Sequence, residues 1–265
     1  MRKLNEICGA VREKRPLIHC ITNPISINQC ANAILAAGAR PIMAEHPAEV
    51  REITETADAL MLNLGSITDV RMQSMEISLR AAKEKKIPVV LDAVGTACSG
   101  LRRVFAIRLL EISAPAIIKG NYSEIYALYR AAYRASGVDA DSALTEEEVR
   151  EAAGVLARKY NTTVLASART DIVTDGVRYI QIRNGTPQLA AVTGTGCMLG
   201  ALCGVFLSVC PGMEAAGTAC AVLGACGQIA ETPKGNGSFM VNLMDALSTA
   251  QDRQLEELIR MEEIG

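Results

Sequence analysis

The sequence of 265 residues contains no tryptophan and only two histidines, and aromatic residues make up 3% of it. So few large rings favour close packing of helices on a sheet over a β-sandwich. The chain has 27 basic and 29 acidic residues, which gives a net charge of −2. A protein with this charge has no strong positive field to attract nucleic acid. We therefore expect no nucleic-acid partner, and any phosphate group should be bound locally.

The chain has nine cysteines, but they do not have the spacing of metal ligands. Their number is odd, no two form a CxxC pair, and two histidines offer little help as ligands. The sequence thus predicts neither a structural zinc site nor a disulfide framework, and we expect a cytoplasmic protein.

The first 16 residues mix charged and apolar positions as an amphipathic helix does, without a signal-peptide core. The apolar stretch 215–230 is shorter than the roughly 20 residues of a membrane span, so we predict a buried helix and no membrane partner.

Short apolar runs alternate with helical patterns from Leu17 onward, which is typical of β-α-β units. Unbroken apolar strands of this kind fit a parallel sheet that helices cover on both sides. The fold class we predict is α/β, doubly wound, with a mostly parallel sheet, in one domain over residues 1–265. The first five predicted strands lie at 17–20, 41–43, 59–64, 88–92 and 116–119.

The second half predicts several further elements. A helix is expected at 122–134, and the polar loop at 137–143 is the best candidate for an insertion. Thr145 and Glu148 form the capping-box pattern at the start of the next helix. A buried strand at 162–167 and a hairpin turning at Asp175-Gly176 follow. From Thr195 to the end we expect almost only helix.

Polar residues follow two of the predicted strands, where open α/β sheets bind their ligands. Asp92 ends one strand, and Asn121 and Glu124 come just after another. An amide and a carboxylate three residues apart share one helical face and can hold hydrated Mg²⁺ against phosphates. An ordinary helix cap would use the same two residues. These residues alone leave both interpretations open.

The turn Gly194-Thr195-Gly196-Cys197 leads directly into a long apolar helix. The first amides of a helix have no partners within it, and glycines permit close approach, so this turn suits a phosphate. A glycine turn that only packs a strand against a helix has the same appearance. The GxxxxGK[ST] pattern and the HRD and DFG patterns of protein kinases are absent, which excludes those frameworks.

Cys197 lies in the first turn of that helix. The positive end of the helix dipole favours a thiolate there, so we predict a lowered pKa and a thiol that can accept a substrate proton. The alternative is a small buried apolar residue, which is our interpretation of the other eight cysteines.

Seven sequence blocks resemble the hydroxyethylthiazole kinases of the ribokinase-like superfamily. They are HCITN at 19–23, PIMAEHPAEV at 41–50, LNLGS at 62–66, VVLDAVG at 89–95, IIKGNYSEI at 117–125, VTGTGC at 192–197 and KGNGSF at 234–239. The superfamily pattern GxGD has aspartate where this chain has Cys197, and cysteine there is characteristic of the thiazole kinases. The resemblance implies an ATP- and Mg²⁺-dependent kinase that phosphorylates the hydroxyl of 4-methyl-5-(2-hydroxyethyl)thiazole in thiamine biosynthesis and salvage.

The resemblance also implies a role for each matching position. Cys197 would be the catalytic base, and the residues around the thiazole alcohol would be Asn23, Met43 and Gly194. The residues that contact ATP would be Lys119 and Ser167, and those that organise Mg²⁺ would be Asp92 and Glu124. The family also implies a homotrimer with active sites between subunits.

Four positions depart from the family pattern: Ala93 replaces proline, Lys119 replaces arginine, Ala168 replaces glycine and Arg169 replaces an acid. Two alternatives therefore stay open. One is another enzyme of this fold, either a kinase for a different heterocyclic alcohol such as hydroxymethylpyrimidine or an ATP-dependent repair dehydratase; Cys197 disfavours both. The other is a weakly active nucleotide-binding or regulatory protein, since fold alone does not guarantee activity.

Overall fold

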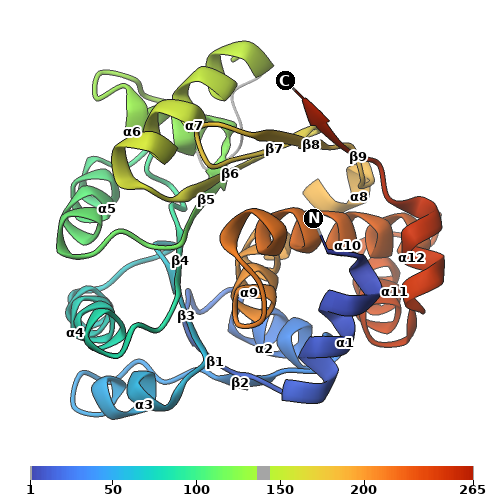
Figure 1. Cartoon of the computed structure of the whole chain (residues 1–265), viewed down its shortest axis with the longest axis horizontal. Coiled ribbons are helices and arrows are strands. Elements are labelled where there is room, and N and C mark those ends of the chain that lie inside the picture. Colours follow the sequence, from blue (N-terminus) through green and yellow to red (C-terminus); the bar gives the residue numbers. More distant parts are fainter. Residues whose placement is uncertain (1, 136–143, 265) are drawn as a thin grey trace.

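One nine-stranded sheet organises the computed structural model, which describes residues 2–135 and 144–264. The strand order is β2-β1-β3-β4-β5-β6-β7-β8-β9. The strands from β2 to β6 are parallel, and β7, β8 and β9 are antiparallel additions at one side. Helices cover both faces, as Figure 1 shows. The predicted fold class, a doubly wound and mostly parallel α/β sheet, is confirmed.

Strands and helices alternate along most of the first half of the chain, and the second half ends in a group of helices followed by one strand. The strands are β1 (Leu17–Ile21), β2 (Arg40–Ile42), β3 (Ala59–Asn63), β4 (Val89–Asp92), β5 (Ile117–Asn121), β6 (Thr163–Ser167), β7 (Asp171–Thr174), β8 (Tyr179–Ile182) and β9 (Met261–Ile264). The helices are α1 (Leu4–Lys14), α2 (Ile27–Ala36), α3 (Val50–Thr56), α4 (Asp69–Lys85), α5 (Gly100–Ile112), α6 (Tyr122–Tyr129), α7 (Glu146–Tyr160), α8 (Pro187–Ala190), α9 (Thr195–Leu207), α10 (Gly212–Ala230), α11 (Asn236–Thr249) and α12 (Asp252–Leu258).

Two apolar cores lie on opposite faces of the sheet, and β3 contributes to both. Ala59 and Met61 belong to the core under α1, α2 and α9 to α12, whereas Leu60 and Leu62 belong to the core under α3 to α7. Successive strand residues point to opposite faces, so an unbroken apolar strand is what a sheet covered on both sides requires. Figure 1 shows these two helical layers on either side of the strands.

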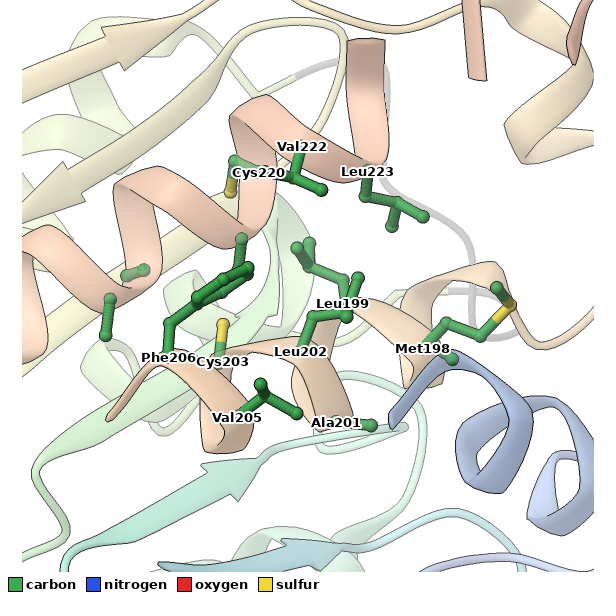
Figure 2. Packing of buried hydrophobic residues seen from close by; sticks show 14 of the residues in the cluster. Met198, Leu199, Ala201, Leu202, Cys203, Val205, Phe206, Cys220, Val222 and Leu223 are labelled. Carbon is green, nitrogen blue, oxygen red and sulfur yellow. The ribbon is translucent and has the colours of Figure 1, made fainter. Parts of the chain in front are cut away.

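The apolar helix α9 lies directly against the strands β1, β3 and β4. A Cβ at Gly200 would stand 2.7 Å from Cε of Met61 and 3.1 Å from Oδ2 of Asp92. The absence of a side chain at Gly200 therefore lets the second turn of α9 approach the end of β4. On its other side α9 packs against α10, with Leu202 and Phe206 near the contact in Figure 2.

The predicted buried helix at 215–230 is confirmed as part of α10, most of which is buried. Within residues 2–135 and 144–264, no helix combines the length and the apolar character needed to cross a membrane. All nine cysteines lie in these ranges and are free thiols.

Two predicted helical segments are corrected by the structure. The helix expected at 122–134 ends at Tyr129, because the backbone beyond it turns away and the carbonyls of Ala131 and Tyr133 accept hydrogen bonds from the Arg103 guanidinium at 2.7 and 2.6 Å. The C-terminal segment is not helical throughout. Residues 261–264 form β9, which pairs with the otherwise open edge of β8.

Local turn and cap patterns are confirmed where the structure describes them. Thr145 and Glu148 form the predicted capping box of α7. The predicted hairpin joins β7 and β8, with Gly176 at φ 89°, although its connection spans the four residues 175–178 rather than two. The loop predicted at 137–143 lies outside the described residues.

Candidate active site

Three polar residues stand side by side at the carboxyl edge of the sheet. Asn63 of β3 is in register with Asp92 of β4, and Asp92 is in register with Lys119 of β5. Residues in register on neighbouring strands send their side chains to the same face. That face is the one on which α9 begins, so the strand ends and the glycine turn meet.

Lys119 and Asp92 form a buried ion pair, with Nζ of Lys119 2.9 Å from Oδ1 of Asp92. Burial alone would lower the pKa of Lys119, but the carboxylates of Asp92 and Glu124 outweigh it and raise that pKa above its ordinary value. Burial raises the pKa of Asp92, which the Lys119 ammonium and the Asn63 amide oppose. The lysine therefore stays charged at neutral pH, held between two carboxyl groups.

The glycine turn brings the first amides of α9 close to this ammonium. Gly194 is the N-cap of α9 and has φ 95°, a left-handed conformation that favours glycine. A Cβ on Gly196 would stand 3.6 Å from Nζ of Lys119, so the turn lies within van der Waals distance of the Lys119 ammonium. Free helix amides beside an ammonium form an arrangement that binds anions.

Cys197 contacts the amides of two asparagines. Nδ2 of Asn23, two residues beyond β1, and Nδ2 of Asn63 each lie 3.3 Å from Sγ of Cys197. The predicted lowering of the thiol pKa is wrong. Burial raises the pKa of Cys197 and the Asp92 carboxylate adds to this, while Lys119 and the Ser26 hydroxyl oppose it. Desolvation of the charged form thus outweighs the helix end, and the thiol is mostly protonated at neutral pH.

Asn63 is a site residue that sequence reasoning missed. Its side chain is fully buried and makes hydrogen bonds to Asp92, Asn23, Cys197 and the backbone of Gly65. The available signal was a polar residue that ends a buried apolar strand, the same signal that identified Asp92. Its importance depends on the strand register, which the sequence does not state.

Glu124 and Asn121 form a capping box at the start of α6, so the cap interpretation of this pair is confirmed. Oε1 of Glu124 accepts the Gly95 N–H and Oε2 accepts the Asn121 N–H, both at 2.7 Å. Burial raises the pKa of Glu124 to about 7, against the opposing effect of Lys119. A role in organising Mg²⁺ stays a prediction. Among the described residues, no three His, Cys, Asp or Glu side chains form a group that could hold a metal ion by themselves.

Met43 and Ser167 lie at the same edge of the sheet but outside the hydrogen-bonded group around Cys197. Met43 follows the edge strand β2 and packs against the core beneath α9. Ser167 ends β6, in register with Asn121, and its hydroxyl donates to the Gly120 carbonyl at 3.4 Å. Their predicted contacts, with the alcohol for Met43 and with ATP for Ser167, stay predictions.

Beside Ser167 lies a third buried carboxyl group, Asp171, which sequence reasoning missed. Oδ1 of Asp171 accepts the Ala168 N–H at 3.0 Å and so holds the turn between β6 and β7. Burial raises the pKa of Asp171 to about 7, and hydrogen bonds from Ala168 and Cys220 oppose the rise.

Comparisons with known proteins agree along nearly the whole chain. The model of the hydroxyethylthiazole kinase family matches residues 8–253. Hydroxyethylthiazole kinase 2 of Clostridium botulinum strain 657 is 42% identical over 261 residues, which cover 97% of this chain and 98% of that protein. Hydroxyethylthiazole kinase of Nitratidesulfovibrio vulgaris is 43% identical over 241 residues, 90% of each chain.

Solved structures give the same picture at two levels of similarity. The hydroxyethylthiazole kinase protein of Pyrococcus horikoshii superposes with a TM-score of 0.90 over 99% of both chains, at 34% identity. A pyridoxal kinase of Bacillus subtilis superposes with a TM-score of 0.63 over 83% of this chain and 94% of its own, at 17% identity. The second likeness shows a shared fold only.

Proposed function

This chain belongs to the hydroxyethylthiazole kinase family, and we propose that it transfers the γ-phosphoryl group of ATP to the hydroxyl of 4-methyl-5-(2-hydroxyethyl)thiazole in thiamine biosynthesis and salvage. The observation that supports this most directly is the position of Cys197. Its sulfur lies at the start of α9, beside the glycine turn and within hydrogen-bonding distance of Asn23 and Asn63. A proton acceptor and an anion site therefore share one edge of the sheet.

In the proposed reaction the alcohol binds near Asn23, Met43 and Gly194 with its hydroxyl directed at Cys197. The alcohol oxygen bonds to the γ-phosphorus, the bond from that phosphorus to the ADP oxygen breaks, and the alcohol proton passes to the Cys197 thiolate, which is the minor form of this side chain at neutral pH. Because phosphoryl transfer has a loose transition state, little deprotonation is needed before the transfer. A base then contributes on the order of 10²-fold to 10⁴-fold, and electrostatic stabilisation supplies more.

On the nucleotide side, we assign charge stabilisation to Lys119, the first amides of α9 and the hydroxyl of Ser167. The Lys119 ammonium is buried beside the turn, where low dielectric strengthens its effect on a phosphate. Because the Lys119 ammonium is already paired with Asp92, it should bind a phosphate more weakly than an unpaired cation would.

Two carboxyl groups suit the Mg²⁺ that accompanies ATP, and Asp92 and Glu124 would hold it. Each of their four oxygens already accepts one hydrogen bond, which leaves lone pairs for hydration water around the ion. Mg²⁺ keeps several waters in most protein sites and takes its remaining ligands from phosphates. When bound, it neutralises charge on the transferring phosphoryl group.

The reaction is tested by incubating the protein with ATP, Mg²⁺ and a panel of thiazole and pyrimidine alcohols while measuring ADP release and product mass. We expect rapid phosphorylation of the hydroxyethylthiazole and little of hydroxymethylpyrimidine. Preference for the pyrimidine would favour a kinase of different specificity. Tight ATP binding without turnover of any alcohol would favour a regulatory protein.

The proposal extends to assembly and location: one kinase domain over residues 1–265, cytoplasmic, forming a homotrimer with active sites between subunits. Exposed apolar residues on and next to two packed helices support the trimer, namely Ile25 at 59%, Leu35 at 55% and Val241 at 60% exposure. Ile25 precedes α2, and Leu35 lies on it. Val241 lies on α11, which packs beside α2.

Light scattering should give the mass of three chains. We expect Val241→Asp to dissociate the trimer, and Val177→Asp, at an exposed hairpin turn, to leave it intact. A wild-type monomer with full activity would contradict this part of the proposal.

A further inference from the structure

The backbone determines which way the Asn63 amide faces. Oδ1 of Asn63 lies 2.9 Å from the N–H of Gly65, and a backbone N–H can only donate. The oxygen must therefore face Gly65, and the NH₂ group must face the other side. There, Nδ2 lies 2.8 Å from Oδ2 of Asp92 and 3.3 Å from Sγ of Cys197, so each of its two hydrogens has one acceptor.

The Asn23 amide is oriented by the same argument. Its Oδ1 accepts the N–H of Ile25 at 3.1 Å, which turns its NH₂ group toward Oδ1 of Asn63 at 3.1 Å and Sγ of Cys197 at 3.3 Å. Both amides thus point donors at the same sulfur. A sulfur that receives two N–H groups is held as an acceptor, and its own hydrogen must point elsewhere.

We propose that Asn63 is a positioning residue for the kinase reaction: its amide joins the Asp92 carboxylate to the Cys197 sulfur and keeps that sulfur ready to receive the proton of the substrate alcohol. The inference rests on the proposed role of Cys197 as base. Asn63 itself need not touch the substrate, since its four hydrogen bonds all go to protein groups.

Gly65 shows how tightly this arrangement is built. A Cβ there would stand 2.7 Å from Nδ2 of Asn23 and 2.9 Å from Oδ1 of Asn63, so only glycine lets both amides approach each other beside the backbone. Asn63 is also fully buried, where an amide is costly unless its hydrogen bonds are made. An apolar residue of equal size would fill the same space without joining Asp92 to Cys197.

Several charged and titratable groups surround the Cys197 sulfur besides the two amides. Asp92 approaches from β4, Lys119 from β5, and the hydroxyl of Ser26 and the thiol of Cys30 from the α2 side. The carboxylate and the second thiol disfavour the thiolate, whereas the ammonium and the hydroxyl favour it. Hydrogen bonds from N–H donors also favour the charged form, so removing one should raise the pKa of Cys197.

The test measures Cys197 directly in Asn63→Leu, which keeps the size of the side chain, and in Asn63→Ser, which is smaller and polar. Alkylation by iodoacetamide is followed from about pH 6 to 11, and peptide mass spectrometry separates Cys197 from the exposed Cys98. At a fixed pH below the midpoint, we expect alkylation of Cys197 to slow by about threefold to tenfold. Asn32→Ala, an exposed asparagine on α2, is the control and should leave the profile unchanged.

Replacing Asn63 should change kcat and leave KM for ATP nearly unchanged. In either Asn63 variant, kcat should fall by about tenfold or more while KM for ATP stays near its wild-type value, because the nucleotide contacts are kept. Circular dichroism confirms that each variant is folded. An unchanged alkylation profile of Cys197 in a folded variant would overturn the inference.

A measurement on the wild-type protein covers the case in which both variants fail to fold. The side-chain amide resonances of Asn63 in an NMR spectrum should shift as Cys197 titrates, and this shift should vanish in Cys197→Ala; no shift in the wild type counts against the inference. If the kinase assay shows that Cys197 is no base, the alkylation and NMR measurements still report whether Asn63 affects the ionisation of the Cys197 sulfur. The failure of one idea is therefore distinguishable from the failure of the other.

Discussion

The ammonium of Lys119 lies 2.9 Å from the carboxylate of Asp92, and both side chains are buried at the carboxyl edge of the sheet. Neither charge has free access to water, so each depends on the other. The pair also links the two halves of the proposed site, since Lys119 lies beside the glycine turn and Asp92 accepts the amide of Asn63.

Removing one member of this pair should cost much more stability than removing a surface charge. We expect Lys119→Met to lower the free energy of unfolding by about 3–5 kcal/mol, because Asp92 is left charged and unpaired in the interior. Urea denaturation followed by circular dichroism measures the change. As a control, Arg253→Met breaks an exposed pair with Glu257 and should cost at most about 1 kcal/mol. Equal small losses in both variants would mean that the buried pair is not needed for stability.

Substitution of Cys197 separates a base from a packing residue. Cys197→Ala should lose most kinase activity, about 10²-fold or more, because no group is left to accept the alcohol proton. Cys197→Asp should keep substantial activity, since a carboxylate can take the same proton. Steady-state ADP release with the thiazole alcohol measures both. Wild-type rates in both variants would remove the base role.

The raised pKa of Cys197 predicts that activity increases with pH. Its ordinary value is 9.0, and the protein raises it, so between pH 6 and 9 the thiolate fraction grows about tenfold per pH unit. The kcat/KM for the thiazole alcohol should climb across this range. In Cys197→Asp the profile should be flat above about pH 8, because a carboxyl group is already ionised there. A wild-type profile that is flat from pH 6 to 9 would contradict a thiol base with this pKa.

Asp171 should make stability depend on pH. Its pKa is about 7 in the folded protein against an ordinary 3.8, so between these values the folded state binds more protons than the unfolded state. The stabilising contribution is therefore complete below about pH 4 and is lost as the pH rises through about 7. In that window the free energy of unfolding falls by up to about 1.4 kcal/mol per pH unit for this group.

Asp171→Asn provides the measurement, because it stays neutral and keeps an oxygen for the Ala168 N–H. Urea denaturation at pH 5 and pH 8 should show the variant gaining stability relative to the wild type at the higher pH. Glu124 titrates in the same window in both proteins, so it cancels in the comparison. If the difference in stability between Asp171→Asn and the wild type is the same at pH 5 and pH 8, Asp171 does not bind a proton in the folded protein.

Local patterns were enough to predict most of the fold. The alternation of apolar runs with helical periods gave the order of strands and helices, and the cap and turn residues Thr145, Glu148 and Gly176 marked boundaries by local hydrogen bonding and backbone conformation. β9 escaped prediction because residues 261–264 are a strand only by virtue of the open edge of β8. The end of α6 depended on Arg103, which lies far away in the sequence.

The sequence by itself determined the fold class, the family resemblance and the candidate roles of Cys197 and the glycine turn, because motif and periodicity are properties of neighbouring residues. Only the tertiary structure decided the environment of that thiol. Burial raised the pKa of Cys197 where the helix end alone predicted the opposite, and strand register placed Asn63 between Cys197 and Asp92. Desolvation and register both depend on residues brought together from distant parts of the chain.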